Sequence, residues 1–169
     1  MSYLVALPIF IPLLTAILCL VSFRFIRLQA FFSVTGAIAL LVSAIVLFNA
    51  LLHNNVIVLQ AGNWPSPFGI TLVADWLSGI MVLATAILGL IIAVYSLVNI
   101  DKARQQHAFF CLYQILLMGV CGAFLTGDLF NLYVFFEIML ITSFVLLTLG
   151  GERAQLEGCL LYTSDAADE

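Results

Sequence analysis

The chain has 169 residues, of which 64% are hydrophobic and only 8% charged, and its mean hydropathy is +1.23. Soluble domains carry about 25% charged residues, so this composition excludes a soluble domain and indicates an integral membrane protein. The formal charge is −4, and no basic tract is present, so we expect the lipid bilayer and not a nucleic acid as a partner.

Five apolar runs approach or exceed the roughly 20 residues that a membrane-spanning helix needs. We place them at residues 3–23, 30–52, 76–98, 108–125 and 129–150. The first run is interpreted as a retained span and not a signal peptide, because its basic neighbours, Arg24 and Arg27, follow it. Pro8 and Pro12 predict a kink or loosening in its first half. The fold class is therefore an all-α, polytopic transmembrane helix bundle of about five spans.

The second span carries small side chains at helical spacing, Gly36, Ala39 and Ser43, which predict close approach of a neighbouring helix. Only Thr126 and Gly127 separate the fourth span from the start of the fifth. These two helices are therefore predicted to form an antiparallel pair in direct contact, with small residues of the fourth span such as Gly119 and Gly122 as contact positions.

The segment between the second and third spans has a different pattern. Apolar runs rich in β-branched residues at 56–59 and 70–73 flank a centre rich in glycine and proline, which predicts a short β-hairpin or tight loop outside the membrane. Trp64 and Trp76 flank this segment. We interpret them as anchors at the membrane interface, with a binding role as the alternative.

The basic residues predict the orientation of the bundle. They all follow the first, third or fifth span, and they are Arg24, Arg27, Lys102, Arg104 and Arg153. With alternating spans these positions lie on one side of the membrane, and the positive-inside rule identifies that side as cytoplasmic. We therefore expect the N-terminus and the hairpin segment to be extracytoplasmic and the tail after Gly151 to be cytoplasmic.

The fifth span contains one acidic residue, Glu137, nine residues after Asp128. Asp128 is a good N-cap and Gly150-Gly151 a plausible stop for this helix. Nine residues rise about 13.5 Å, close to half of the roughly 30 Å hydrocarbon core. A carboxyl group at that depth costs about 2.5 kcal/mol or more when ionised, and such acids usually face a bundle interior or a hydrated path.

Glu137 is therefore a candidate proton-relay residue. The alternatives are a permanently protonated acid bonded to a neighbouring helix and a tolerated polar residue in a helix contact. Tyr133, one turn earlier, and Thr142 or Ser143 beyond could order water towards the carboxyl group, although ordinary hydrogen bonding explains them equally well.

Two further polar residues of the fourth span are weaker candidates for relay support. Gln114 lies inside the span, and His107 begins it on the expected cytoplasmic side. A solvated or capping role is the alternative for His107 and also for His53, because both lie at helix ends. No lysine or arginine lies inside a span, so a cationic partner of Glu137 is not part of these 169 residues.

No motif supports covalent catalysis or a cofactor. The sequence contains no glycine-rich phosphate loop, Ser-His-Asp set, HExxH or CxxCH motif, so we expect a non-enzyme without a cofactor or metal. Cys19, Cys111 and Cys121 lie in apolar runs without metal-ligand spacing and are interpreted as small core residues.

Two segments carry a resemblance to a known family. GDLFNLYVFFEIMLITSFVLL at 127–147 and GNWPSPFGITLVADWLSGIM at 62–81 resemble the N-terminal third of the D subunit of Mrp-type cation/proton antiporters. These subunits are similar to the antiporter-like membrane subunits of respiratory complex I. The resemblance covers about residues 1–158.

The resemblance implies a bacterial plasma-membrane subunit of about fourteen helices in two inverted five-helix repeats, working in a multi-subunit complex that exchanges protons for monovalent cations such as Na⁺. In this family the acid of the fifth helix, matched by Glu137, pairs with a lysine on a broken seventh helix. That lysine and the second repeat fall outside this sequence, so we expect antiport from the intact subunit and not from this chain alone.

Two other functions remain open at this point: a membrane subunit of a redox-driven proton pump, and a structural helical bundle in which Glu137 carries no proton. Residues 159–169, CLLYTSDAADE, depart from the family. They resemble translated sequencing-adapter DNA, and we interpret them as a non-native tail, with a short native cytoplasmic tail as the alternative.

Overall fold

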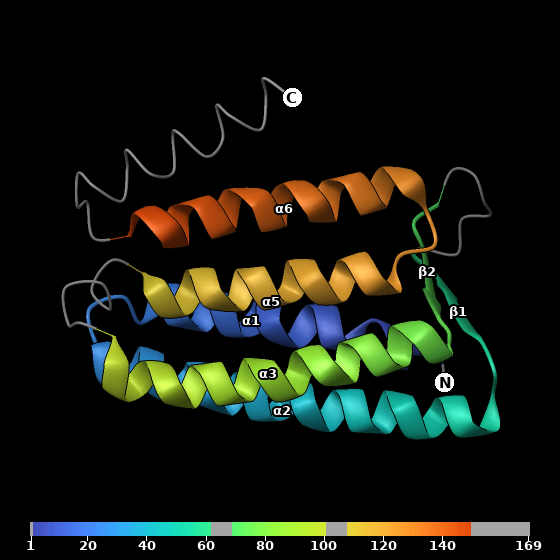
Figure 1. The fold of residues 1–169 in the computed structure, drawn as a ribbon, viewed down its shortest axis with the longest axis horizontal. Helices are drawn as coiled ribbons and strands as arrows, with labels where there is room; N and C mark the ends of the chain where they lie inside the picture. Colours follow the sequence, from blue (N-terminus) through green and yellow to red (C-terminus); the bar gives the residue numbers. More distant parts are fainter. Residues whose placement is uncertain (1, 62–68, 101–107, 150–169) are drawn as a thin grey trace.

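Five α-helices, one short 3₁₀ helix and one two-stranded sheet are the regular elements of the described part of the chain, residues 2–61, 69–100 and 108–149 of a computed structural model. In chain order the elements are η1 (Ser2–Val5), α1 (Leu7–Val21), α2 (Ile26–His53), β1 (Ile57–Gln60), β2 (Thr71–Ala74), α3 (Trp76–Asn99), α5 (Phe109–Leu125) and α6 (Leu129–Thr148). The helices run side by side along one axis, and the sheet lies at one end of the bundle (Figure 1). The predicted fold class, a membrane helix bundle with a hairpin, is confirmed.

Among the described residues, three helices are long and apolar enough to cross a membrane, namely α2, α3 and α6 with 28, 24 and 20 residues. The span expected as one helix at 3–23 is instead a 3₁₀ turn, η1, followed by the 15-residue α1. Pro8 lies in the first turn of α1, where its missing N–H costs nothing, and Pro12 lies inside the helix. At about 2.0 Å per 3₁₀ residue and 1.5 Å per α residue, η1 and α1 together still rise about 30 Å.

The predicted hairpin is present. Strands β1 and β2 pair antiparallel with Ile57 opposite Ala74 and Gln60 opposite Thr71, one residue later in each strand than expected. Trp76 begins α3, and its ring lies edge-on to Phe48 of α2 with a centroid separation of 5.9 Å. Trp64 lies outside the described residues.

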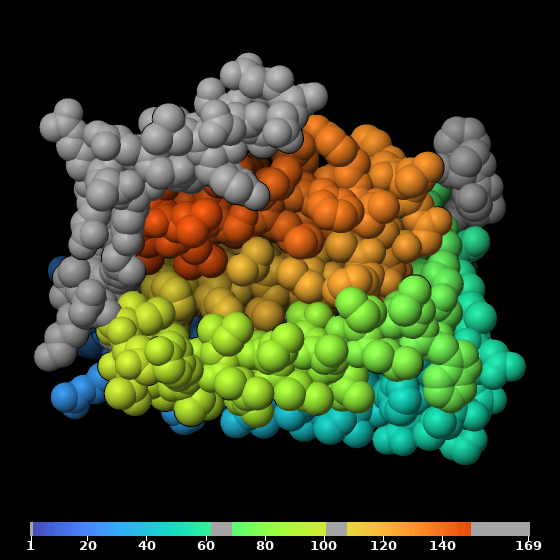
Figure 2. Space-filling model, viewed as in Figure 1, coloured from blue at the N-terminus to red at the C-terminus, as the bar shows by residue number. Residues whose placement is uncertain are grey.

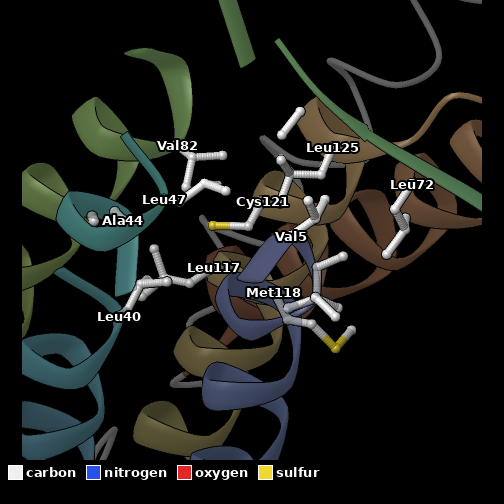
Figure 3. Close-up of a cluster of buried hydrophobic side chains, with 14 of the residues drawn as sticks. Val5, Leu40, Ala44, Leu47, Leu72, Val82, Leu117, Met118, Cys121 and Leu125 are labelled. Atoms are coloured by element: carbon white, nitrogen blue, oxygen red, sulfur yellow. The ribbon is translucent and has the colours of Figure 1, made fainter. Parts of the chain in front are cut away.

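Four helices, α1, α2, α3 and α5, enclose the apolar core. Figure 3 shows labelled side chains from η1, α2, α3, α5 and β2 converging on one cluster that includes Leu47, Val82, Leu117 and Cys121. Leu47, Val82 and Cys121 are fully buried. The described cysteines, Cys19, Cys111 and Cys121, are all buried and unpaired, so they are core residues as predicted.

The small-residue contact predicted for α2 forms with α1. A Cβ atom added to Gly36 would overlap the side chain of Thr15, so the two helix backbones approach more closely than an alanine would permit. Ser43 of the same stripe is buried, whereas Ala39 is only partly covered. The Thr15 hydroxyl donates to the Ile11 carbonyl oxygen of its own helix at 2.7 Å, so the contact between Thr15 and Gly36 is one of packing.

Candidate functional site

The candidate acid lies near the middle of α6. Asp128 caps the helix by accepting a 2.9 Å hydrogen bond from the backbone N–H of Phe130, as its position predicted. Glu137 follows eight residues after Leu129 and eleven before Thr148, the last helical residue. The predicted glycine stop at 150–151 lies outside the described residues. The half-buried Glu137 is therefore far from both helix ends.

Helix α6 lies at one edge of the bundle and packs mainly on α5 (Figures 1 and 2). Within the helix only Asn131 and Thr142 are buried in the described structure. The strongly exposed side chains of α6 are apolar or aromatic: Leu129, Phe130, Tyr133, Phe136, Leu140, Ile141 and Leu147. Helix α6 thus presents a broad apolar face beyond its contact with α5, with Glu137 near the middle of the helix.

The contact between α5 and α6 uses glycines of α5. A Cβ atom on Gly122 would overlap the ring of Phe135, and one on Gly119 would lie 2.9 Å from Cγ of Met139. These positions let aromatic and thioether side chains of α6 lie directly on the α5 backbone. The predicted antiparallel contact of the fourth and fifth spans is confirmed.

Of the predicted supporting residues, Tyr133 lies beside Glu137. Its side chain interacts with the Glu137 carboxyl group from one helical turn away and is otherwise largely exposed. The hydroxyl of Thr142 donates to the carbonyl oxygen of Ile138, and that of Ser143 donates to Leu140 at 2.9 Å. Thr142 and Ser143 therefore bond within their own helix, as their alternative interpretation expected.

The side chain of Gln114 bonds to α2 and not to α6, the helix that carries Glu137. Its amide Nε2 donates to the backbone carbonyl oxygen of Ser33 in α2 at 2.8 Å and lies 3.2 Å from the Ser33 hydroxyl. The side chain is fully buried. Among the described residues its hydrogen bonds link α5 to α2, and none joins it to Glu137. His107 lies outside the described residues.

Two buried polar contacts escaped sequence analysis. The hydroxyl of Tyr113 in α5 donates to the carbonyl oxygen of Gly89 in α3 at 2.8 Å. The amide of Gln29 donates to the carbonyl oxygen of Phe23 at 3.0 Å and so satisfies an orphan acceptor just after α1. The sequence signal for the contact of Gln29 with Phe23 was a single glutamine in the first turn of an apolar helix.

The described helices around Glu137 carry no basic side chain. No lysine or arginine occurs in α3, α5 or α6. No group of three or more histidine, cysteine or acidic side chains that could hold a metal ion occurs in the part of the chain that the structure describes.

Comparisons with known proteins place this arrangement among antiporter-like membrane subunits. The D subunit of the Na⁺/H⁺ antiporter of Bacillus subtilis is 43% identical over 163 residues, which cover 96% of this chain and 33% of that protein. No protein-family model matches the chain. The chain thus spans about a third of the length of the relatives it matches.

Two solved complexes contain a chain with the same fold. The Mrp complex from Dietzia sp. matches with a TM-score of 0.82 and 27% identity over 96% of this chain and 31% of that one. An archaeal respiratory membrane complex, the membrane-bound sulfane sulfur reductase, matches with a TM-score of 0.88 and 26% identity over 95% and 33% of the two chains. The chain is therefore homologous to the N-terminal third of the D subunit of Mrp-type Na⁺/H⁺ antiporters.

Proposed function

We propose that this chain is the N-terminal part of a proton-conducting subunit in a multi-subunit Na⁺/H⁺ antiporter of the bacterial plasma membrane, and that Glu137 is a proton-relay residue. The observation that carries the proposal is one acid in the middle of a membrane-length helix, in a chain 43% identical to an antiporter D subunit along nearly all its length. Other subunits of the complex, protons and monovalent cations are the proposed partners.

The environment of Glu137 supports a relay role. An ionised carboxyl group in hydrocarbon is costly, so its charge state responds strongly to any nearby cation or water. The neighbouring Tyr133 hydroxyl is one group that interacts with this carboxyl. The apolar face of α6 leaves room for the downstream helices of the full-length subunit, which would bring a cationic partner. Two such groups titrate as a coupled pair, and changing their separation moves a proton.

The decisive experiment uses the full-length subunit in its assembled complex. Glu137→Gln and Glu137→Ala are expected to lower cation-dependent dissipation of a pH gradient in everted vesicles at least tenfold, whereas Glu137→Asp keeps the acid and retains part of the activity. Ser143→Ala is the matched control, because it removes a polar side chain of the same helix whose hydroxyl, among the described residues, donates to the Leu140 carbonyl oxygen of its own helix. Undiminished antiport in the Glu137→Gln variant would contradict the relay role and support a structural bundle in which Glu137 carries no proton.

A redox-driven pump is the second candidate, favoured by the match to the archaeal respiratory complex. The higher sequence identity to the antiporter subunit supports antiport instead. Purification of the native complex separates the two candidates. Copurifying small membrane subunits without redox centres support antiport, and iron–sulfur subunits support the redox-driven pump.

A further inference from the structure

The hairpin is joined to the turn between α5 and α6. Leu72 of β2 forms an antiparallel bridge with Thr126, and the backbone N–H of Gly127 donates to the carbonyl oxygen of Thr71 at 2.9 Å. Leu72 is buried in this contact region. The turn therefore pairs with β2 through an isolated bridge, although about fifty residues, including the described helices α3 and α5, separate the two segments in the chain.

Glycine at position 127 is required for this close approach. A Cβ atom there would lie 2.6 Å from Cγ2 of Val73, far inside ordinary van der Waals contact. Any side chain at this position must displace the turn from β2 or displace Val73. Gly127 and Val73 therefore limit how closely the turn approaches the hairpin.

The same turn is bonded to the first turn of α6. The Asn131 amide donates to the Thr126 hydroxyl at 3.1 Å, and Asp128 caps the backbone N–H of Phe130. Asn131 is one of the few buried residues of α6. Hydrogen bonds therefore run without interruption from β2 through Thr126 and Gly127 to the start of α6.

A displacement of this turn moves Glu137. An α-helix is stiff along its axis, and nine residues, about 13.5 Å, separate Asp128 from Glu137. Phe135 and Met139 of α6 also lie on Gly122 and Gly119 of α5, so packing between the two helices restrains α6 as well. The directional bonds at the hairpin end act together with this packing to restrain the axial position of α6.

We propose that the β1–β2 hairpin sets the depth of Glu137 in the membrane, with Gly127 as the positioning residue and Val73 as its counterpart. The inference rests on the proposed relay role of Glu137. It gives the hairpin a function in proton transfer, because a shift of about 1 Å is enough to change the rate of a transfer step strongly.

The test is a double-mutant cycle in the full-length subunit within its complex. Gly127→Ala is expected to lower antiport on the order of tenfold and to shift the midpoint of its pH profile. Val73→Ala alone is expected to be near wild type, and combining the two substitutions should restore both rate and profile, because the smaller side chain accommodates the added Cβ. Val56→Ala, at an exposed position before β1 and outside the paired residues of the hairpin, is the matched control.

Two outcomes would overturn the inference. One is a Gly127→Ala protein that assembles normally and keeps the wild-type pH profile, and the other is a loss of activity that Val73→Ala fails to restore. If Gly127→Ala does not assemble, Asn131→Ala replaces it, since this change cuts the bond from the turn to α6 without adding atoms, and an unchanged pH profile then contradicts the proposal. Failure of the relay role itself is detected separately by Glu137→Gln.

Discussion

At the residue scale, the start of α3 is held by a reciprocal pair of hydrogen bonds. The Asp75 carboxylate accepts from the backbone N–H of Ser78 at 2.7 Å, and the Ser78 hydroxyl accepts from the backbone N–H of Asp75 at 2.7 Å. The hydrogen bond from the backbone N–H of Ser78, followed by the Ser78 side chain, holds the pKa of Asp75 below its ordinary value. The capping box thus joins the end of β2 to the start of α3.

Replacing Asp75 by alanine removes an N-cap and is expected to lower the free energy of unfolding by about 1 kcal/mol. The expected loss is modest because the carboxylate is exposed and solvent screens its charge. A lowered folded-state pKa means that the contribution is complete above the ordinary aspartate pKa of about 3.9 and is lost as the pH falls through the folded-state value. Thermal unfolding of the full-length subunit in detergent, at neutral and acidic pH, measures both effects.

Asp75→Asn is the control for this prediction, since asparagine caps a helix but does not titrate. The difference between wild type and the asparagine variant should shrink as the pH approaches 3. A difference that stays constant across this range would show that the charge of Asp75 contributes nothing to the cap.

At the element scale, the pairing of α5 with α6 depends on two glycines of α5, whose lack of a side chain lets α6 lie close to the α5 backbone. The sequence predicted that these helices touch, because a connection of only two residues is too short to hold them apart. It also indicated Gly119 and Gly122 as contact positions. It could not predict which side chains of α6 would cover them, because that depends on the rotation of both helices about their axes. Phe135 and Met139 occupy these places.

Gly122→Ala is expected to destabilise the subunit by about 1–3 kcal/mol, because the added Cβ atom would overlap the ring of Phe135 and force the helices apart. Gly119→Ala is the matched variant on the same helix. There the obstacle is the flexible side chain of Met139, so we expect a smaller effect. Thermal unfolding of the two full-length variants in detergent compares them, and equal losses would contradict this explanation.

At the scale of the whole molecule, the two ends of the bundle differ in kind. The N-terminus, the hairpin and the turn between α5 and α6 gather at one end, and the connection between α1 and α2, with Arg24 and Arg27, lies at the other (Figure 1). For Arg24 and Arg27 this arrangement agrees with the predicted relative placement, whereas Lys102, Arg104 and Arg153 lie outside the described residues. Which end faces the cytoplasm remains a prediction of the positive-inside rule.

Cysteine labelling tests the orientation. Val58→Cys in β1 and Phe25→Cys before α2 are both exposed positions at opposite ends, and the described native cysteines are buried. In intact cells, a membrane-impermeant maleimide is expected to label the full-length subunit at position 58 but not at position 25. Permeabilised cells should show labelling at both positions. The reverse pattern would place the hairpin in the cytoplasm.

The sequence by itself determined the apolar spans, the hairpin, the Asp128 cap and the position of Glu137 within its helix. These features follow from composition, spacing and helical rise, which are properties of neighbouring residues. Tertiary structure alone decided that Gln114 meets Ser33, 81 residues away, and that β2 holds the turn before α6. Such contacts depend on how rigid helices pack against one another, and that packing cannot be predicted from a local sequence pattern.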